Sequence, residues 1–281
     1  MANSTTNPQV SLKIVAIIGF LFSLPAAAQI AKELNYQVGP KPLISITNDY
    51  GSITVQPSAN NQVIVTMLTR SDGVSFSSEQ RGNRVELRLE SNVRGTELAD
   101  CKVLVPRDSI LSLRSSDGKL HAQGLSGDII LEAATAALEV TDISDAHIHV
   151  RTLSGPVTLS NIRHSHLDIN SVSGDLRIRN VIDSTLDAHS GSGQITYDGD
   201  PGSTGDYTLT SHSGNLDVSI PATASVEIKS RSLRGEPDQD VANLSAGPAT
   251  PRQNRFLPLR RIAASRFVLR SFKGRIRIRR P

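Results

Sequence analysis

The sequence predicts an all-β fold, a β-solenoid similar to a parallel β-helix, with coils of about 19 residues. The first observation is a Ser-Gly step that recurs along the chain with 19, 19 and 21 residues between successive glycines. A repeat of this length is typical of a solenoid, in which each unit buries its apolar face only against its neighbours. The four steps are Ser154-Gly155, Ser173-Gly174, Ser192-Gly193 and Ser213-Gly214.

The second observation is that apolar residues alternate with polar ones on both sides of each step, the pattern of a strand with one buried face. They lie seven and five residues before the glycine and two and four residues after it. The positions before the glycine hold Ile148, Leu167, Leu186 and Tyr207, then Val150, Ile169, Ala188 and Leu209. Those after it hold Val157, Leu176, Ile195 and Leu216, then Leu159, Ile178, Tyr197 and Val218.

The alternation changes phase at the Ser-Gly step, so we expect two short strands and two corners in each coil. Glycine is expected there because it tolerates the backbone angles of a sharp corner. Earlier coils fit the same frame around Gly118 and around Ala136, which occupies the glycine position. We therefore assign residues 101–233 to regular solenoid repeats.

The N-terminus is expected to be a signal peptide over residues 1–28. Lys13 precedes an apolar run from Ile14 to Phe22, and the small residues Ala26, Ala27 and Ala28 follow, the pattern that a signal peptidase cleaves. An uncleaved membrane anchor stays open as an alternative. Residues 29–40 are expected to be a short linker.

Residues 41–100 are also strand-like, and apolar residues flank Gly51 at the offsets of the main repeat. These strands are either irregular first coils or a separate capping sheet, and we expect a cap continuous with the solenoid because terminal repeats must cover an open end.

At the other end, residues 234–265 leave the pattern and are rich in Pro and Arg, so we expect a loop extruded from the last coil. Residues 266–281 restore the repeat as the final coil, with Phe267, Leu269, Gly274, Ile276 and Ile278 in register.

Taken together, the signal peptide, the Ser-Gly-Asp-Leu and Ser-Gly-Asn-Leu steps, the extruded loop and the closing run Phe272 to Ile278 resemble the bacterial putative-adhesin family of β-strand-repeat proteins. The resemblance covers residues 40–281. It implies a right-handed β-solenoid displayed in the cell envelope or outside the cell. It supplies no catalytic residues, because the family is a domain of unknown function.

Several polar residues are candidates for a functional site. His147 and His166 occupy equal positions in successive coils, and His149, Asp168 and Asp187 form a second row. Equal positions should stack about 4.8 Å apart, so a metal site is conceivable. Outward positions of a solenoid are polar by default, however, and we expect no metal or other cofactor.

Parallel β-helices also carry enzymes that cleave polysaccharides, which would make Asp168, Asp183 and Asp187 candidate acids and bases. Aromatic residues make up only 4% of the chain and Trp is absent, so stacking platforms for sugars are scarce. We expect no enzyme and no catalytic residues. The glycine-rich segment from Gly199 to Gly205 lacks the lysine and the helix of a phosphate loop, and an enlarged corner accounts for it.

Charge is distributed unevenly. Residues 241–281 hold 11 Lys or Arg and no Asp or Glu, whereas residues 29–240 hold 18 basic and 27 acidic residues. A basic end binds anionic surfaces such as lipid head groups, although Arg275, Arg277 and Arg279 would also protect an open edge from pairing. Nucleic acid is not expected for an exported chain with few aromatics.

These observations predict an exported, non-enzymatic binding scaffold in the periplasm, at the cell surface or outside the cell. Its expected partner is an envelope component, either an anionic lipid, a glycan or a protein, with peripheral membrane contact through the basic end. A carbohydrate-active β-helix enzyme and an accessory protein for envelope stress or assembly are the alternatives.

Overall fold

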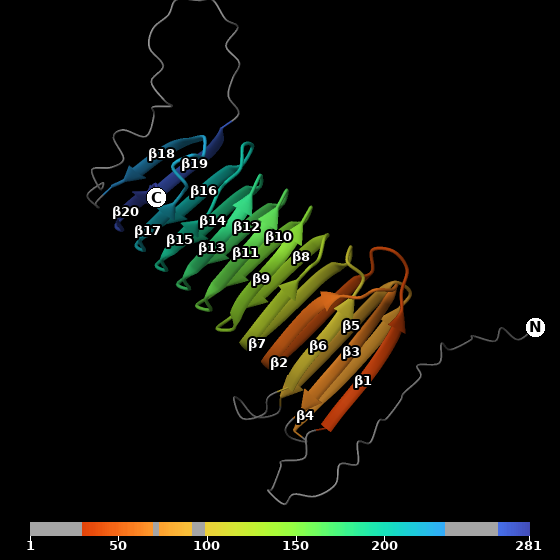
Figure 1. The fold of residues 1–281 in the computed structure, drawn as a ribbon. Helices are drawn as coiled ribbons and strands as arrows, with labels where there is room; N and C mark the ends of the chain where they lie inside the picture. The colour runs from red at the N-terminus through yellow and green to blue at the C-terminus, as the bar shows by residue number, and fades with distance from the viewer. Residues whose placement is uncertain (1–29, 70–72, 92–98, 234–263) are drawn as a thin grey trace, which may run out of the picture.

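The computed structural model describes residues 30–69, 73–91, 99–233 and 264–281. These residues form twenty strands in one sheet that winds into an elongated β-solenoid (Figure 1). They form no helix, and so none that could cross a bilayer. The expected signal peptide, residues 1–28, lies outside the described residues, as does nearly all of the expected loop at 234–265.

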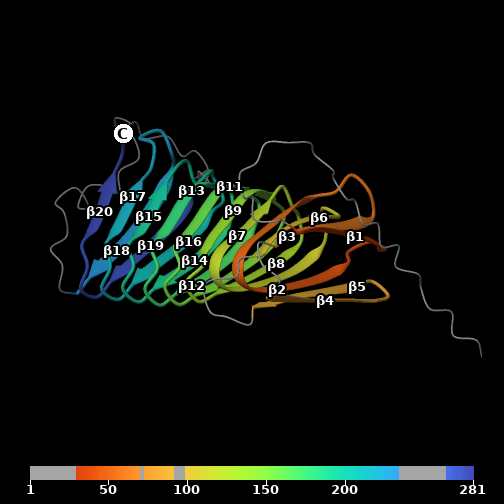
Figure 2. The same ribbon diagram turned by 90° about the horizontal axis from the view of Figure 1, so that it is seen from below.

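The regular coils are built from two parallel ladders with the apolar core between them (Figure 2). β7 (Ile110–Gln123) contributes its first half to one ladder and its second half to the other. The first face continues through β8 (Asp128–Ala133), β10 (His147–Thr152), β12 (His166–Ser171), β14 (Thr185–Ser190) and β16 (Asp206–Ser211). The second face continues through β9 (Ala137–Ser144), β11 (Val157–Arg163), β13 (Leu176–Ile182), β15 (Ile195–Asp198) and β17 (Leu216–Ser219).

The predicted core rows are confirmed. Ile148, Leu167 and Leu186 are register partners on successive first-face strands, and all three are buried. Full burial of such a side chain is worth about 1.5 to 3 kcal/mol. Because every coil adds residues to the same rows, the core grows with each repeat and needs no second layer.

The glycines of the Ser-Gly steps are required for a different reason from the one expected. The φ angles of Gly155, Gly174 and Gly193 do not lie in the left-handed region. Gly51 and Gly118, at the glycine position of earlier coils, do have a positive φ. A Cβ on Gly174 would instead lie well inside 3.0 Å of the carbonyl oxygen of Gly155, and the same holds at each later step. Close approach between coils therefore excludes a side chain at this corner.

Near the C-terminal ends of β9, β11 and β13 lies a second repeat that was not predicted from the sequence. Asp142, Asn161 and Asn180 stand 19 residues apart with φ of 57°, 56° and 50°. Asn and Asp adopt this left-handed conformation more readily than other residues with a side chain. The Asn161 amide donates to Asp142 Oδ1 at 3.0 Å, and the Asn180 amide donates to Asn161 Oδ1 at 3.2 Å. A ladder of side-chain hydrogen bonds thus joins the coils at this edge.

At the N-terminal end the coils do not follow chain order. β2 (Leu43–Pro57) stacks directly on β7, with Gly51 opposite Gly118. On the other side of β2 lie β5 (Arg84–Ser91) and β6 (Ala99–Val105), which together form a further coil. The boundary expected between residues 100 and 101 therefore falls inside β6, and the regular repeats begin with β7.

Antiparallel strands complete this end. β3 (Gln62–Thr69) pairs with β6, β4 (Val74–Arg81) pairs with β5, and β1 (Ile30–Gln37) pairs with β3. Residues 41–100 thus contain both coils and a cap continuous with the solenoid. The linker expected at 29–40 is wrong, because most of it is β1, in which Leu34 and Tyr36 are buried.

At the C-terminal end, too, the strands do not stack in the order in which they follow one another along the chain. β19 (Ser265–Ser271) and β20 (Ile276–Arg279) restore the repeat in register, as predicted. β18 (Val226–Ser232) does not belong to that coil, however, because it pairs with the outer edge of β19. The last coil is therefore inserted between β16 and β18, and is not a single coil interrupted by a loop.

Replacing Gly193 by Ala tests the close approach of the coils. The added Cβ would meet the Gly174 carbonyl oxygen, and we expect the free energy of unfolding to fall by about 1 to 3 kcal/mol, as for overpacked sites. The control is Ser192→Ala at the exposed neighbouring position, expected to stay within about 0.5 kcal/mol of wild type. Equal urea midpoints for the two variants would contradict a steric requirement for glycine at this corner.

Candidate functional site

The outward side chains of the first face form rows that run along the solenoid, as the repeat predicted. His147 and His166 are register partners, and their rings meet edge to face with centroids 6.0 Å apart. His147 also lies 3.3 Å from Asp128. In the described parts of the chain, no three His, Cys, Asp or Glu side chains are placed to hold a metal ion.

The second row contains His149, Asp168 and Asp187 in register. His149 Nδ1 lies 3.5 Å from Asp168 Oδ2, and Asp187 Oδ1 lies 2.9 Å from His189 Nε2. Each carboxylate therefore faces a histidine on the outward surface. Asp183, the third residue weighed as a catalytic group, lies at the corner between β13 and β14 and bonds within the chain.

Asp183 explains the glycine-rich segment between Gly199 and Gly205. Its Oδ1 accepts hydrogen bonds from the backbone N–H groups of Ser203 and Thr204, at 2.8 and 3.1 Å, and from the Thr204 hydroxyl. These are the kind of donors that a phosphate would need. The hydrogen bond from Ser203 is the main cause that lowers the Asp183 pKa. The segment is thus an enlarged corner closed by the protein's own carboxylate.

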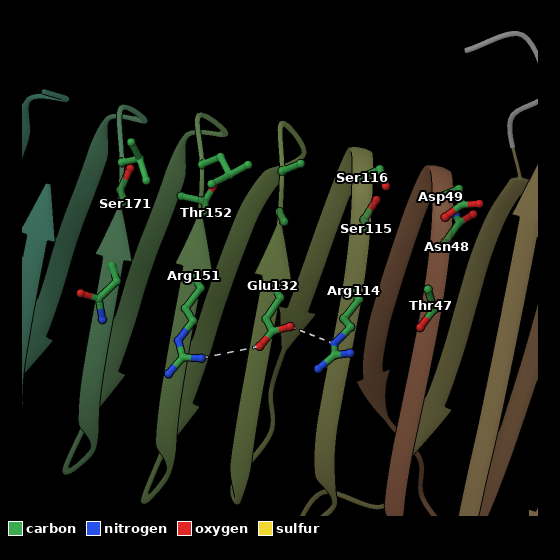
Figure 3. A pocket seen from close by; sticks show the side chains of 15 residues that line it. Thr47, Asn48, Asp49, Arg114, Ser115, Ser116, Glu132, Arg151, Thr152 and Ser171 are labelled. Atoms are coloured by element: carbon green, nitrogen blue, oxygen red, sulfur yellow. Dashed lines mark ion pairs between the residues drawn. The ribbon is translucent and has the colours of Figure 1, made fainter. Parts of the chain in front are cut away.

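A groove crosses the first face where its strands end (Figure 3). Its volume is about 680 Å³, and it extends from β2 across β7, β8 and β10 to the end of β12. A row of polar side chains lines it, four residues before the glycine position of each coil. In coil order this row holds Thr47, Arg114, Glu132, Arg151 and Asn170.

Ion pairs between coils hold this row in place. Glu132 lies between two arginines, with Arg114 Nε 2.9 Å from one carboxylate oxygen and Arg151 Nη1 4.0 Å from the other, as Figure 3 shows. Along the rim, Leu153 and Val172 are each 59% exposed, which is unusual for large apolar side chains in this protein. The groove therefore combines paired charges with an apolar rim. The sequence contains one signal for this groove, the polar position four residues before each glycine position, but that position alone predicts only an outward side chain.

The last coil carries the charge imbalance predicted for the C-terminus. Arg275, directly before β20, and Arg277 and Arg279 on β20 point outward, while Ile276 and Ile278 are buried between them. Arg277 lies 4.0 Å from Asp217 on β17. Between 264 and 281 there is no Asp or Glu to neutralise the coil. The expected Pro- and Arg-rich loop, which contains Arg260 and Arg261 and would lie beside this coil, falls outside the described residues.

Similarity to known proteins covers most of the chain. The family model described as Toastrack DUF4097 matches residues 43–247. A crystal structure of a putative cell adhesion protein from Clostridium sporogenes ATCC 15579 aligns with 89% of this chain and 100% of its own, at 11% identity and a TM-score of 0.29. A crystal structure of a putative adhesin from Bacteroides fragilis NCTC 9343 aligns with 90% of this chain and 98% of its own, at 12% identity and a TM-score of 0.38. No curated protein matches.

The corner at Asp183 yields a pH prediction. Because its pKa is lowered from 3.8 in the folded state, its ionised form stabilises the fold above that pH, and this contribution is lost as the pH falls through the lowered pKa. Asp183→Asn, which tolerates the observed φ of 47°, should melt below wild type at pH 7. The two melting temperatures should converge as the pH falls below 3.8 and through the lowered pKa of Asp183, and a gap independent of pH would contradict this role.

Proposed function

The chain belongs to the Toastrack DUF4097 family, and from that premise we propose that it is a non-enzymatic binding scaffold, exported to the cell envelope, that acts through its surface. The observation that carries the proposal is the charge of the last coil, which presents cations on both faces and has no carboxylate of its own. Such a surface attracts anionic head groups or acidic polymers.

The geometry of the last coil supports a docking role. Phe267, Leu269 and Ile276 are buried in the core rows, so the strands that carry the arginines are rigid. Arg275 and Arg279 alternate with these apolar residues and point outward, and neither has an ion pair with any carboxylate in the described residues. Arg275 and Arg279 can therefore bind an anionic surface without first breaking an ion pair within the described residues.

Export is proposed from the pattern of residues 1–28, in which a basic residue, an apolar run and three alanines follow one another. The single cysteine, Cys101, is buried, and burial raises its pKa to about 12. It is therefore unreactive, and the fold needs no disulfide. The periplasm, the cell surface and the medium are all compatible with this chain.

Vesicle binding tests the docking role. The variant Arg275→Gln/Arg277→Gln/Arg279→Gln should lose affinity for anionic vesicles by up to about 3 kcal/mol, because a basic residue near such a surface contributes about 1 kcal/mol. Wild-type binding should also weaken between 0.1 and 1 M salt, as the screening length falls from about 10 to about 3 Å. Sedimentation with anionic and neutral vesicles measures both effects.

The matched control is Arg177→Gln/Arg179→Gln on β13, which changes two of the same positions in an earlier coil. It should bind vesicles like wild type. Equal binding of the wild-type protein to anionic and neutral vesicles, or none to either, would leave the arginines as protection of an open edge and overturn the proposed docking.

The alternative of a carbohydrate-active enzyme rests on the stacked pair Asp168 and Asp187. We expect Asp168→Asn/Asp187→Asn to keep the melting temperature and any biological phenotype, because these carboxylates face histidines on an open surface. A purified chain that depolymerises envelope glycans, and loses that activity in the double variant with an unchanged melt, would replace the scaffold proposal by the enzyme. An accessory role in envelope assembly would appear as a specific protein partner.

A further inference from the structure

A second cavity lies on the first face beyond the groove, at the C-terminal ends of β14, β16, β19 and β18, the strands at the left-hand end of the solenoid in Figure 1. Its volume is about 470 Å³, within the range of small-molecule sites. It continues the row that lines the groove, four residues before the glycine position. Here that row holds His189, Thr210 and Arg270, with Arg231 of β18 beside them.

The charges in this cavity differ from those in the groove. Arg231 and Arg270 are direct register partners on neighbouring strands, and like charges in this arrangement repel one another. In the groove, Glu132 lies between Arg114 and Arg151 and neutralises them. No carboxylate in the described residues forms an ion pair with Arg231 or Arg270. Within the described residues, the two guanidinium groups thus have no counterpart of the Glu132 carboxylate, which neutralises the arginines of the groove.

The wall of the cavity also contains unsatisfied polar atoms. The hydroxyl oxygens of Ser190 and Thr210 are buried, yet neither has a hydrogen-bond partner among the described residues. Ser171 and Ser211, which occupy the same position as Ser190 in neighbouring coils, bond to corner carbonyls. Buried polar groups are normally paired, and an exception calls for an explanation. Both oxygens are closed off from the surface by the chain itself, so they are not contact points for a ligand in the cavity.

An apolar platform completes the site. The rings of His212 and Phe272 stack with centroids 4.9 Å apart and an interplanar angle of 10°. Leu233, which is 55% exposed, lies at the same cavity. A flat ring beside an apolar side chain is the kind of surface on which the less polar face of a sugar packs. The cavity is therefore lined by both cations and a flat apolar platform.

We propose that this cavity binds an acidic sugar, a uronic acid residue of a glycan, whose carboxylate lies between Arg231 and Arg270. Arginine suits this role because its planar fork of donors matches a carboxylate. The ring of the sugar packs against the platform formed by His212, Phe272 and Leu233. This inference goes beyond the proposed docking of the last coil and does not depend on it.

Calorimetric or NMR titration of the full chain with glucuronate, glucose and glucose 6-phosphate tests the proposal. Glucuronate should bind at least tenfold more tightly than glucose, because one charged hydrogen bond is worth about a factor of ten. Glucose 6-phosphate separates the two anion sources, and tighter binding of it than of glucuronate would replace the uronate by a phosphosugar. Equal binding of glucuronate and glucose, or none of either, would overturn the site.

Variants locate the binding. Arg270→Gln should weaken glucuronate binding about tenfold, while Arg151→Gln, at the same position in the groove, should leave it unchanged. Arg231→Gln on the outermost strand gives a second readout should Arg270→Gln fold poorly. The Arg275→Gln/Arg277→Gln/Arg279→Gln variant should keep glucuronate binding, which distinguishes this site from vesicle docking. An equal loss in Arg151→Gln and Arg270→Gln would contradict the assignment.

Discussion

The structure depends on one contact, the approach of each corner glycine to the corner of the coil before it. A Cβ on Gly174, Gly193 or Gly214 would collide with the preceding glycine carbonyl, so the coils stack at the separation of neighbouring strands. The adjoining serines strengthen this edge, because the Ser173 N–H donates to Leu153 O at 2.8 Å and the Ser192 N–H donates to Val172 O at 3.1 Å. The corners therefore continue the hydrogen-bonded sheet.

This constraint explains why surface chemistry is organised in rows. Once the coils are held in register, equal positions become neighbours, and each outward position defines a line of side chains along the solenoid. One such row carries the paired charges of the groove, with Glu132 between two arginines, and ends in Arg231 and Arg270, which have no ion pair within the described residues. The core rows are apolar and buried in every coil, so differences in binding between coils come from these outward residues.

The sequence predicts much of this fold, because the alternation of apolar and polar residues indicates which position of a coil each residue occupies. It does not predict which coil stacks on which. Ile228 and Phe267 occupy the same position of different strands, as do Ile46 and Leu87 at the other end of the solenoid. The apolar pattern is the same whether the next strand of the chain joins the adjacent coil or the coil beyond it. The order of β2, β5, β18 and β19 depends on long-range pairing that no local pattern records. β1 was not predicted because its polar residues are typical of a linker. The cavity was not predicted because Arg231 and Arg270 come from two strands that are separated by residues 233–264 in the sequence.

The most direct test of the stacked corners is amide hydrogen exchange in the native protein, measured by NMR at the serines of the Ser-Gly steps. Ser154, Ser173, Ser192 and Ser213 lie at exposed corners, yet each amide donates to a carbonyl one coil earlier at 2.8 to 3.1 Å. If the corners are part of the sheet, these four amides should be protected to the same degree as the strand amides of Leu167 and Leu186. Exchange at the rate of an open loop would show that the coils are held together by their cores alone, and would contradict a sheet that continues through the corners.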